Sequence, residues 1–304
     1  MEGSMLAVTI LGNNSAIPAF NRHPTAQVVQ NAEESFLIDC GEGTQMQMIE
    51  FKIRSSKINH IFISHLHGDH YFGLIGLLTS MGLSGRKHEL HLYAPAILKT
   101  IIELQLQVAS AHLPFELNFH PHDKEGVILD DKKIIVESFK VKHRIECRGF
   151  LFREKKNLRK IEIEEVKKYN VPSSFFENLH RGEDFISDNN TVIKNELLTS
   201  AVSPPKTYAY CTDTLYDEGL VEKIKNVDLL YHEATYLHGL QQKAASRFHC
   251  TSIEAATIAK KAGVKKLLLG HFSSMYESLE DFKTEACTIF ENTELALEGI
   301  CYTV

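Results

Sequence analysis

The chain has 304 residues, of which 43% are hydrophobic, so it can bury a large core, and about 150 residues per domain allows one or two domains. Its formal net charge of −6 excludes a uniformly basic nucleic-acid-binding surface but leaves room for a local basic patch. The sequence has no apolar run near the roughly 18 residues of a membrane helix, and its amino terminus lacks the charge order of a secretory signal. We therefore expect a cytoplasmic protein that makes no use of a membrane.

Strand-like and helix-like segments alternate along most of the sequence. Short runs rich in β-branched and aromatic residues predict strands at 6–11, 27–30, 35–39, 60–64, 90–93, 133–139, 208–212, 228–233 and 265–270. Helices are predicted at 44–51, 71–83 and 252–262. Because several of the strands are almost entirely apolar, as strands covered on both faces should be, we expect helices to flank the sheets.

Segment 153–190 interrupts this alternation, since it is rich in charge and poor in large aliphatic side chains. We interpret it as an inserted arm. Its first part carries a group of cations that could contact phosphates: Arg153, Lys155, Lys156, Arg159 and Lys160. A solvated hairpin or helix is the alternative interpretation.

The most informative stretch is the motif SHLHGDH at 64–70, which directly follows an apolar strand. It places three imidazoles and one carboxylate within six residues, at the point where the strand should reach the sheet edge. Imidazole nitrogen and carboxylate oxygen favour zinc first, and manganese or another divalent ion second. A solvated histidine-rich loop is the alternative. The four candidate ligands are His65, His67, Asp69 and His70.

A site with two metal ions needs more ligands than one loop supplies. His143, Asp213 and His271 each follow the carboxyl end of an apolar predicted strand. Our assignment places His65, His67 and His143 on one ion, Asp69, His70 and His271 on the other, and Asp213 between the two. Ions about 3.5 to 4 Å apart favour hydrolysis of a phosphate ester. We expect no nucleotide cofactor, because the sequence contains neither a GxGxxG motif nor a Walker loop.

Among the remaining histidines, His249 stands out because it lies just before the predicted helix 252–262. Glu233 ends the predicted strand 228–233, so the two side chains could approach the same rim of the site. A carboxylate that orients an imidazole produces a general acid. The alternative to a general acid, given equal weight, is that His249 is a structural residue packed on Thr251 at the start of the helix.

The sequence resembles the metallo-β-lactamase superfamily through SHLHGDH, His143, Asp213 and His271, and within it the ribonuclease Z family. The narrower resemblance rests on further motifs: FLIDCGEGTQ at 36–45, CTDT at 211–214, HEAT at 232–235, HCTSIEAA at 249–256 and HFSSMY at 271–276. It covers nearly the whole chain. It implies a single α/β domain over 1–304, an αββα sandwich of two mixed β-sheets flanked by helices, with 153–190 as an inserted substrate-binding arm.

The resemblance also implies an activity. A member of this family is a zinc-dependent endoribonuclease that cuts precursor tRNA 3′ of the discriminator nucleotide, by attack of a metal-bridged hydroxide. The cut leaves a tRNA 3′-hydroxyl and a 5′-phosphorylated trailer. The resemblance implies two Zn²⁺ ions per subunit, with Mn²⁺ or another divalent ion as the alternative, and a homodimer whose arm binds tRNA. Asp69 would hold the proton of the hydroxide, and Glu233 with His249 would relay a proton to the leaving group.

Three positions depart from the family pattern. The arm has Val171 before Pro172 rather than a Gly-Pro element, and Met275 stands where the family commonly has arginine. The family's Arg-Asn pair appears as Arg22 and His23, so Arg22 is kept as a candidate substrate contact.

Two other functions remain open at this point. One is a small-molecule phosphodiesterase on the same site, with the arm serving dimerisation. The other is a metal-stabilised RNA-binding protein without catalysis, which the complete ligand set with Glu233 and His249 disfavours, because binding alone needs no acid.

Overall fold

The computed structural model describes residues 6–31, 33–155, 158–201 and 204–304. These residues divide into two compact units. We call 6–153 together with 206–304 the sandwich body, and 154–205 the arm unit. No helix among the described residues has the length and apolar character needed to cross a membrane.

The sandwich body contains two seven-stranded mixed sheets. The first has the order β20-β1-β3-β4-β5-β6-β7 and comprises β1 (Ala7–Gly12), β3 (Ala26–Gln30), β4 (Ser35–Ile38), β5 (Ile58–Phe62), β6 (Leu90–Ala94), β7 (Leu117–Pro121) and β20 (Cys301–Thr303). The second has the order β19-β17-β16-β15-β10-β9-β8 and comprises β8 (Gly126–Asp130), β9 (Ile134–Val141), β10 (Cys147–Glu154), β15 (Thr207–Cys211), β16 (Leu229–Glu233), β17 (Lys266–Gly270) and β19 (Thr293–Leu295). Strands near the candidate site run parallel to their neighbours in both sheets. These are β4, β5 and β6 in the first sheet and β15, β16 and β17 in the second.

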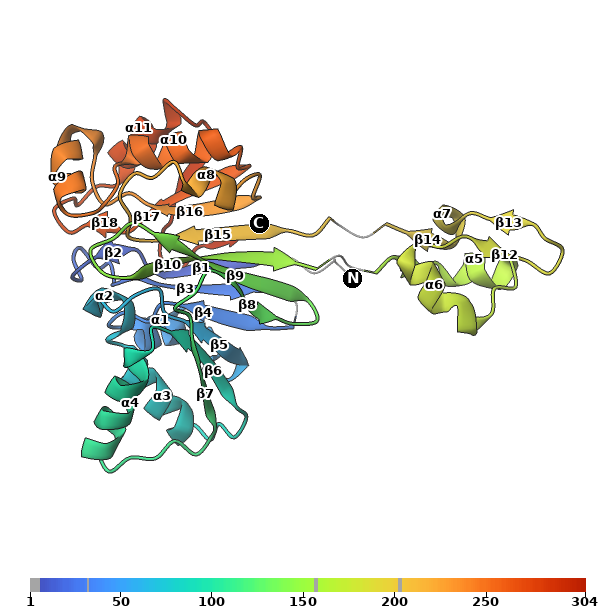
Figure 1. The fold of residues 1–304 in the computed structure, drawn as a ribbon, viewed down its shortest axis with the longest axis horizontal. Coiled ribbons are helices and arrows are strands. Elements are labelled where there is room, and N and C mark those ends of the chain that lie inside the picture. The colour runs from blue at the N-terminus through green and yellow to red at the C-terminus, as the bar shows by residue number, and fades with distance from the viewer. Residues whose placement is uncertain (1–5, 32, 156–157, 202–203) are drawn as a thin grey trace. The chain divides into compact units, whose positions relative to one another are not determined.

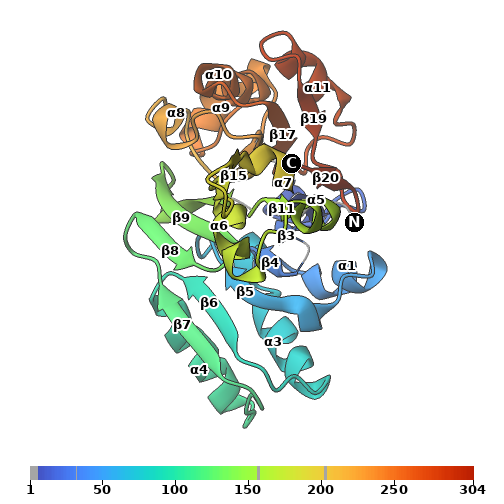
Figure 2. The same cartoon turned by 90° about the vertical axis from the view of Figure 1, so that its right-hand side faces the viewer.

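Helices cover the outer face of each sheet (Figures 1 and 2). The first sheet is covered by α1 (Thr44–Glu50), α3 (Leu74–Leu83) and α4 (Ile97–Val108), and the second by α8 (Leu220–Lys223), α10 (Ser252–Ala262) and α11 (Glu280–Cys287). An apolar cluster that is rich in aromatic rings fills the space between the two sheets. Phe62 of the first sheet lies 5.5 Å from both Phe150 and Phe152 of the second, measured between ring centroids. This arrangement confirms the predicted αββα sandwich.

The predicted helix 71–83 is divided in the structure. It forms α2 (Gly68–Tyr71) and α3, separated at Phe72 and Gly73. The backbone N–H of Gly73 donates to the carbonyl of Cys40 at 2.9 Å, and a Cβ at this position would lie 2.2 Å from the carbonyl oxygen of Gly41. The break therefore arises from close backbone packing, which a helical pattern in the sequence does not reveal.

The arm unit has a small hydrophobic core of its own. Val166, Leu179 and Leu198 are buried there, with Phe175 and Phe176 packed around them. Its elements are β11 (Lys160–Ile161), α5 (Ile163–Lys168), α6 (Phe176–Arg181), β12 (Phe185–Ile186), β13 (Val192–Ile193), α7 (Asn195–Leu198) and β14 (Thr199–Ser200). The compact unit continues past the expected boundary at 190 to Pro205, because β14 pairs with β11 and α7 supplies a core residue.

We predict that Gly12→Ala destabilises the sandwich body and that Gly76→Ala does not. A Cβ at Gly12 would lie 1.7 Å from the carbonyl oxygen of Pro24, so the backbone must shift, at a cost of roughly 1–3 kcal/mol. Gly76 lies in α3 with open space around it, so alanine there should stabilise by about 0.5–1 kcal/mol. Urea unfolding of both variants measures this, and equal midpoints would contradict the packing described here.

Candidate metal centre and active site

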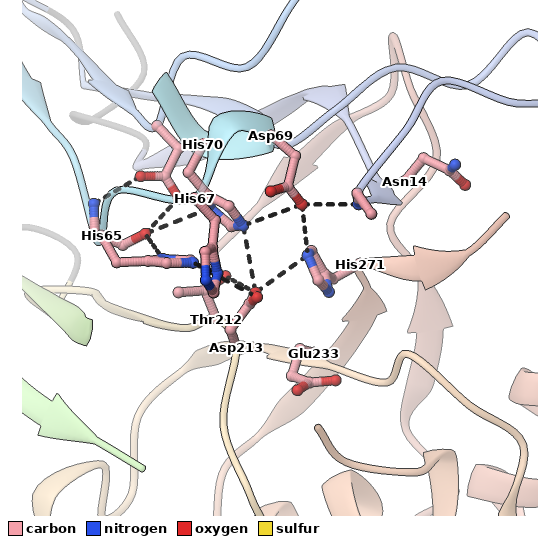
Figure 3. A network of polar contacts seen from close by, with 12 residues as sticks. Asn14, His65, His67, Asp69, His70, Thr212, Asp213, Glu233 and His271 are labelled. Atoms are coloured by element: carbon pink, nitrogen blue, oxygen red, sulfur yellow. Dashed lines mark hydrogen bonds and ion pairs between the residues drawn. The ribbon is translucent and has the colours of Figure 1, made fainter. Parts of the chain in front are cut away.

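The candidate ligands come from strand ends in both sheets and converge on one site (Figure 3). The strand β5 leads into the SHLHGDH loop and α2, whereas β9, β15 and β17 lead to His143, Asp213 and His271. Because the carboxyl ends of parallel strands meet at one edge of a sheet, short extensions of these strands reach the same place. The structure thus brings together all seven residues that the sequence singled out as ligands.

One group of ligand atoms surrounds the first position. The Nε2 atom of His65 lies 2.9 Å from Nδ1 of His67, and that atom lies 3.1 Å from Nε2 of His143. One carboxylate oxygen of Asp213, Oδ2, lies 3.6 Å from Nε2 of both His65 and His143. Three imidazole nitrogens and one oxygen therefore face a common point.

A second group uses the other oxygen of the same carboxylate. Oδ1 of Asp213 lies 3.1 Å from Nε2 of His271 and 3.4 Å from Nε2 of His70. Oδ2 of Asp69 lies 3.5 Å and 3.6 Å from the same two nitrogens. The two oxygens of Asp213 thus point to different groups, as a bridging ligand requires.

These spacings fit metal ions. Ligands about 2.0–2.1 Å from a tetrahedral zinc ion lie roughly 3.3 Å from one another, close to the separations observed. Nε2 of His70 and Nε2 of His271 are buried and have no hydrogen-bond partner among the described residues, although buried polar atoms are normally satisfied. Burial lowers the pKa of His65 well below its usual value, which keeps the imidazole in the neutral form that binds metals.

The second nitrogen of most ligand imidazoles is held by another group. Asp39 accepts from Nδ1 of His70 at 2.7 Å, from the backbone N–H of Ser64 at 2.7 Å and from the Tyr210 hydroxyl at 2.7 Å. Such bonds fix the tautomer and the direction of the ring. The remaining contacts pair His65 Nδ1 with Ser64 Oγ at 3.0 Å, His143 Nδ1 with the Phe248 carbonyl at 3.0 Å, and His271 Nδ1 with Thr235 Oγ1 at 3.0 Å.

His249 and Glu233 form a pair beside the second ligand group. Nδ1 of His249 lies 2.9 Å from Oε1 of the buried Glu233, and the His249 ring stacks 5.4 Å from that of His271. Burial acts to lower the pKa of His249, but the carboxylate of Glu233 outweighs it and the pKa is raised to about 9. The ring thus contacts Glu233 and Thr235, while the Thr251 side chain instead caps α10 with Glu254.

A cleft of about 440 Å³ opens onto the centre. Its wall includes the ligands His67, Asp69 and Asp213 together with His249, and it also includes residues to which the sequence assigned no role: Ile17, Glu42, Phe72 and Arg144. The guanidinium of Arg144 lies 3.2 Å from Nε2 of His67. Only one feature of the sequence could have identified Arg144 as a cleft residue. It directly follows His143, and a residue beside a metal ligand tends to lie at the mouth of the site.

The candidate substrate contacts lie in varied surroundings. Arg22 is buried, and its guanidinium donates to Asn14 Oδ1 at 2.9 Å and to the Glu277 carbonyl at 3.0 Å, which favours a structural role. Arg153 pairs with Glu137 at 2.9 Å, and Arg159 donates to Thr199 Oγ1 at 2.7 Å. Of the others, Lys160 is exposed, Lys155 is partly buried, and Lys156 lies outside the described residues.

The chain matches a protein-family model and curated relatives. A family model described as "Anti-Pycsar protein Apyc1" matches residues 6–158, the half of the chain that carries SHLHGDH and His143. Ribonuclease Z of Bacteroides thetaiotaomicron is 42% identical over 297 residues, covering 97% of this chain and 94% of that protein. This second match also takes in Asp213, Glu233, His249 and His271.

Solved structures agree with the sequence relatives. Human tRNase Z, short form, superposes with a TM-score of 0.69 at 26% identity, covering 97% of this chain and 98% of that one. The metallo-β-lactamase fold protein YhfI from Bacillus subtilis gives a TM-score of 0.70 at 20% identity, covering 99% of this chain and 100% of that one, which shows the fold alone. The chain therefore belongs to the ribonuclease Z family of metallo-β-lactamase-fold hydrolases, and its residues 6–158 also match the Apyc1 family model.

Proposed function

We propose that this protein is a metal-dependent endoribonuclease that cuts precursor tRNA 3′ of the discriminator nucleotide, leaving a tRNA 3′-hydroxyl and a 5′-phosphorylated trailer. The observation that carries the proposal is the juxtaposition of two complete ligand groups, divided by Asp213, with the Glu233–His249 pair. The names of the relatives supply the substrate class. A protein that only bound RNA would not need the imidazole–carboxylate pair.

We assign two Zn²⁺ ions to each subunit, with Mn²⁺ or another divalent ion as the alternative. His65, His67 and His143 would hold one ion, Asp69, His70 and His271 the other, and Asp213 both. When bound, the ions would supply Lewis acidity that activates water and neutralises charge on the phosphate.

The side chains around the ions would move the protons. Asp69, whose Oδ2 accepts from the backbone N–H of Ala16 at 2.8 Å, would take the proton of the attacking water. His249, kept protonated by Glu233, would donate its proton to the departing O3′ as the P–O3′ bond breaks. The proton balance then closes, with the tRNA leaving as a 3′-hydroxyl and the trailer retaining the phosphate.

The same proposal assigns tRNA binding to the arm, segment 153–190 within a metallo-β-lactamase domain of 1–304, and expects a homodimer in the cytoplasm. The arm unit is not strongly basic, since acidic and basic residues are nearly balanced over 154–205. Lys167, Lys168 and Lys194 each pair with a nearby carboxylate. We therefore expect the arm to contact tRNA through a few cations, including Lys160, rather than through a broad positive field.

The direct test is incubation of metal-loaded protein with an end-labelled precursor tRNA, with every cut mapped to the nucleotide. A single chelator-sensitive cut after the discriminator, leaving a 3′-hydroxyl, supports the proposal. Turnover of small phosphodiesters with no cut in precursor tRNA would favour a small-molecule phosphodiesterase instead.

We predict that His65→Ala abolishes both zinc retention and precursor cleavage. The Nε2 atom of His65 lies within 3.6 Å of His67 and Asp213, so its loss opens the first ligand group. Zinc content by mass spectrometry and cleavage rate are measured on the same sample. Full zinc content with full activity would refute the ligand assignment.

His249→Ala, by contrast, should lower the cleavage rate by about 10²- to 10⁴-fold while zinc content stays at the wild-type value, because a general acid is lost but no ligand. His112→Ala is the matched control, since His112 is an exposed imidazole and its loss should leave the rate unchanged. A metal-loaded His249→Ala protein with wild-type rate would remove the proton-relay role.

Removal of the arm unit should weaken tRNA binding while leaving phosphodiester hydrolysis at the site intact. Arg153 and Thr207 are direct partners in the antiparallel pair of β10 and β15, so 154–206 can be replaced by an Asn-Gly turn. We expect hydrolysis of a chromogenic phosphodiester to survive and cleavage of precursor tRNA to fall at least tenfold, through a raised KM. Unchanged tRNA cleavage would show that the arm does not bind substrate.

A further inference from the structure

A second group of ligand-type side chains lies apart from the centre described above. It comprises Glu34 in the turn before β4, His60 in β5, and Asp131 directly after β8. One potential ligand atom from each residue lies within 4.8 Å of the other two. His60 precedes His65 by five residues, or roughly 16 Å of extended strand, so the group lies toward the opposite end of the strands.

The two carboxylates face each other without a compensating cation. Among the described residues neither Glu34 nor Asp131 has an ion pair with lysine or arginine, because the neighbouring Lys133 pairs with Glu33 at 3.2 Å. One oxygen of Glu34, Oε2, is buried and has no hydrogen-bond partner there. Burial and the nearby Asp131 carboxylate both raise the pKa of Glu34. A positive charge or a proton is therefore missing from this group.

His60 supplies a neutral nitrogen at the same place. Its side chain is buried, with 8% of the residue exposed, and it stacks on His91 with 4.9 Å between ring centroids. Burial, followed by the nearby His91, lowers the pKa of His60 to about 4, so it cannot serve as the missing cation at neutral pH. A neutral imidazole beside two carboxylates is a donor set that zinc and manganese accept.

We propose that Glu34, His60 and Asp131 bind a divalent transition-metal ion of the zinc or manganese class, which joins the two sheets. His60 lies in the first sheet and Glu34 in the turn that leads into its strand β4, whereas Asp131 lies in the turn between β8 and β9 of the second sheet. The bound ion links three chain segments that are distant in sequence, and water completes its coordination. Of the three proposed ligands, His60 also lines a cleft of about 600 Å³, whose wall includes Lys87, Glu89 and His91.

The competing explanation is a proton shared by Glu34 and Asp131, since one of two adjacent carboxylates can stay protonated. The two explanations differ in zinc stoichiometry. The test compares the zinc content of variants with that of wild type. Its result therefore does not depend on how many ions the SHLHGDH centre binds or on whether the protein cuts tRNA.

The experiment uses full-length protein stripped with chelator, reloaded with Zn²⁺ and freed of excess ion by gel filtration. Zinc per chain is measured by mass spectrometry for wild type, His60→Gln, Asp131→Asn and the control Glu50→Gln, which removes an exposed carboxylate in α1. We expect wild type and Glu50→Gln to hold one more equivalent than the other two variants. Zinc should also raise the unfolding temperature of wild type more than that of Asp131→Asn, because the ion joins the sheets.

Equal zinc content in all four proteins would overturn the proposal and leave the shared proton as the explanation. Circular dichroism shows whether each variant is folded, and Glu34→Gln replaces any variant that is not. Precursor cleavage by the folded variants should stay within twofold of wild type, because these residues lie outside the candidate active site.

Discussion

The buried carboxylate of Asp213 determines how the site is organised, because its two oxygens face different ligand groups. Only 2% of this residue is exposed, and the described residues pair it with imidazoles rather than with lysine or arginine. Burial acts to raise the pKa of Asp213, but His271 and His70 hold it well below its usual range, so the group stays charged. A buried charge costs several kcal/mol unless it is compensated, and without ions the compensation requires positively charged His70 and His271. Imidazoles that bind a metal are neutral, so the two ions that we propose, one at each oxygen, would replace the positive charge of those protons.

The αββα sandwich makes that arrangement attainable. Strand ends from both sheets must meet within a few ångströms, and Asp39 ties the two sides together by accepting from His70 of the first sheet's loop and from Tyr210 of the second sheet. The backbones at Asp39 and His271 adopt positive φ angles of 55° and 59°, a strained conformation for residues other than glycine. Strain of this kind persists where the surrounding bonds determine the position, and it commonly accompanies functional sites.

Much of the site could be predicted because its residues follow apolar strands. A continuous apolar run predicts a buried strand, and the polar residues just after it must lie at the sheet edge, which located His143, Asp213 and His271. The weaker strands β7 and β8 were missed because their residues are partly exposed and carry little periodicity. The sequence also does not predict contacts between segments that are far apart along the chain. The break before α3, the burial of Arg22 and the meeting of Glu34 with Asp131 all depend on tertiary packing.

We propose that two ions bind, one on each side of Asp213. Anomalous diffraction at the zinc edge, from crystals of zinc-loaded protein, locates such ions. We expect two peaks about 3.5–4 Å apart, one beside His65, His67 and His143 and the other beside Asp69, His70 and His271, with one Asp213 oxygen at each. A single peak, or two peaks that Asp213 does not bridge, would contradict it.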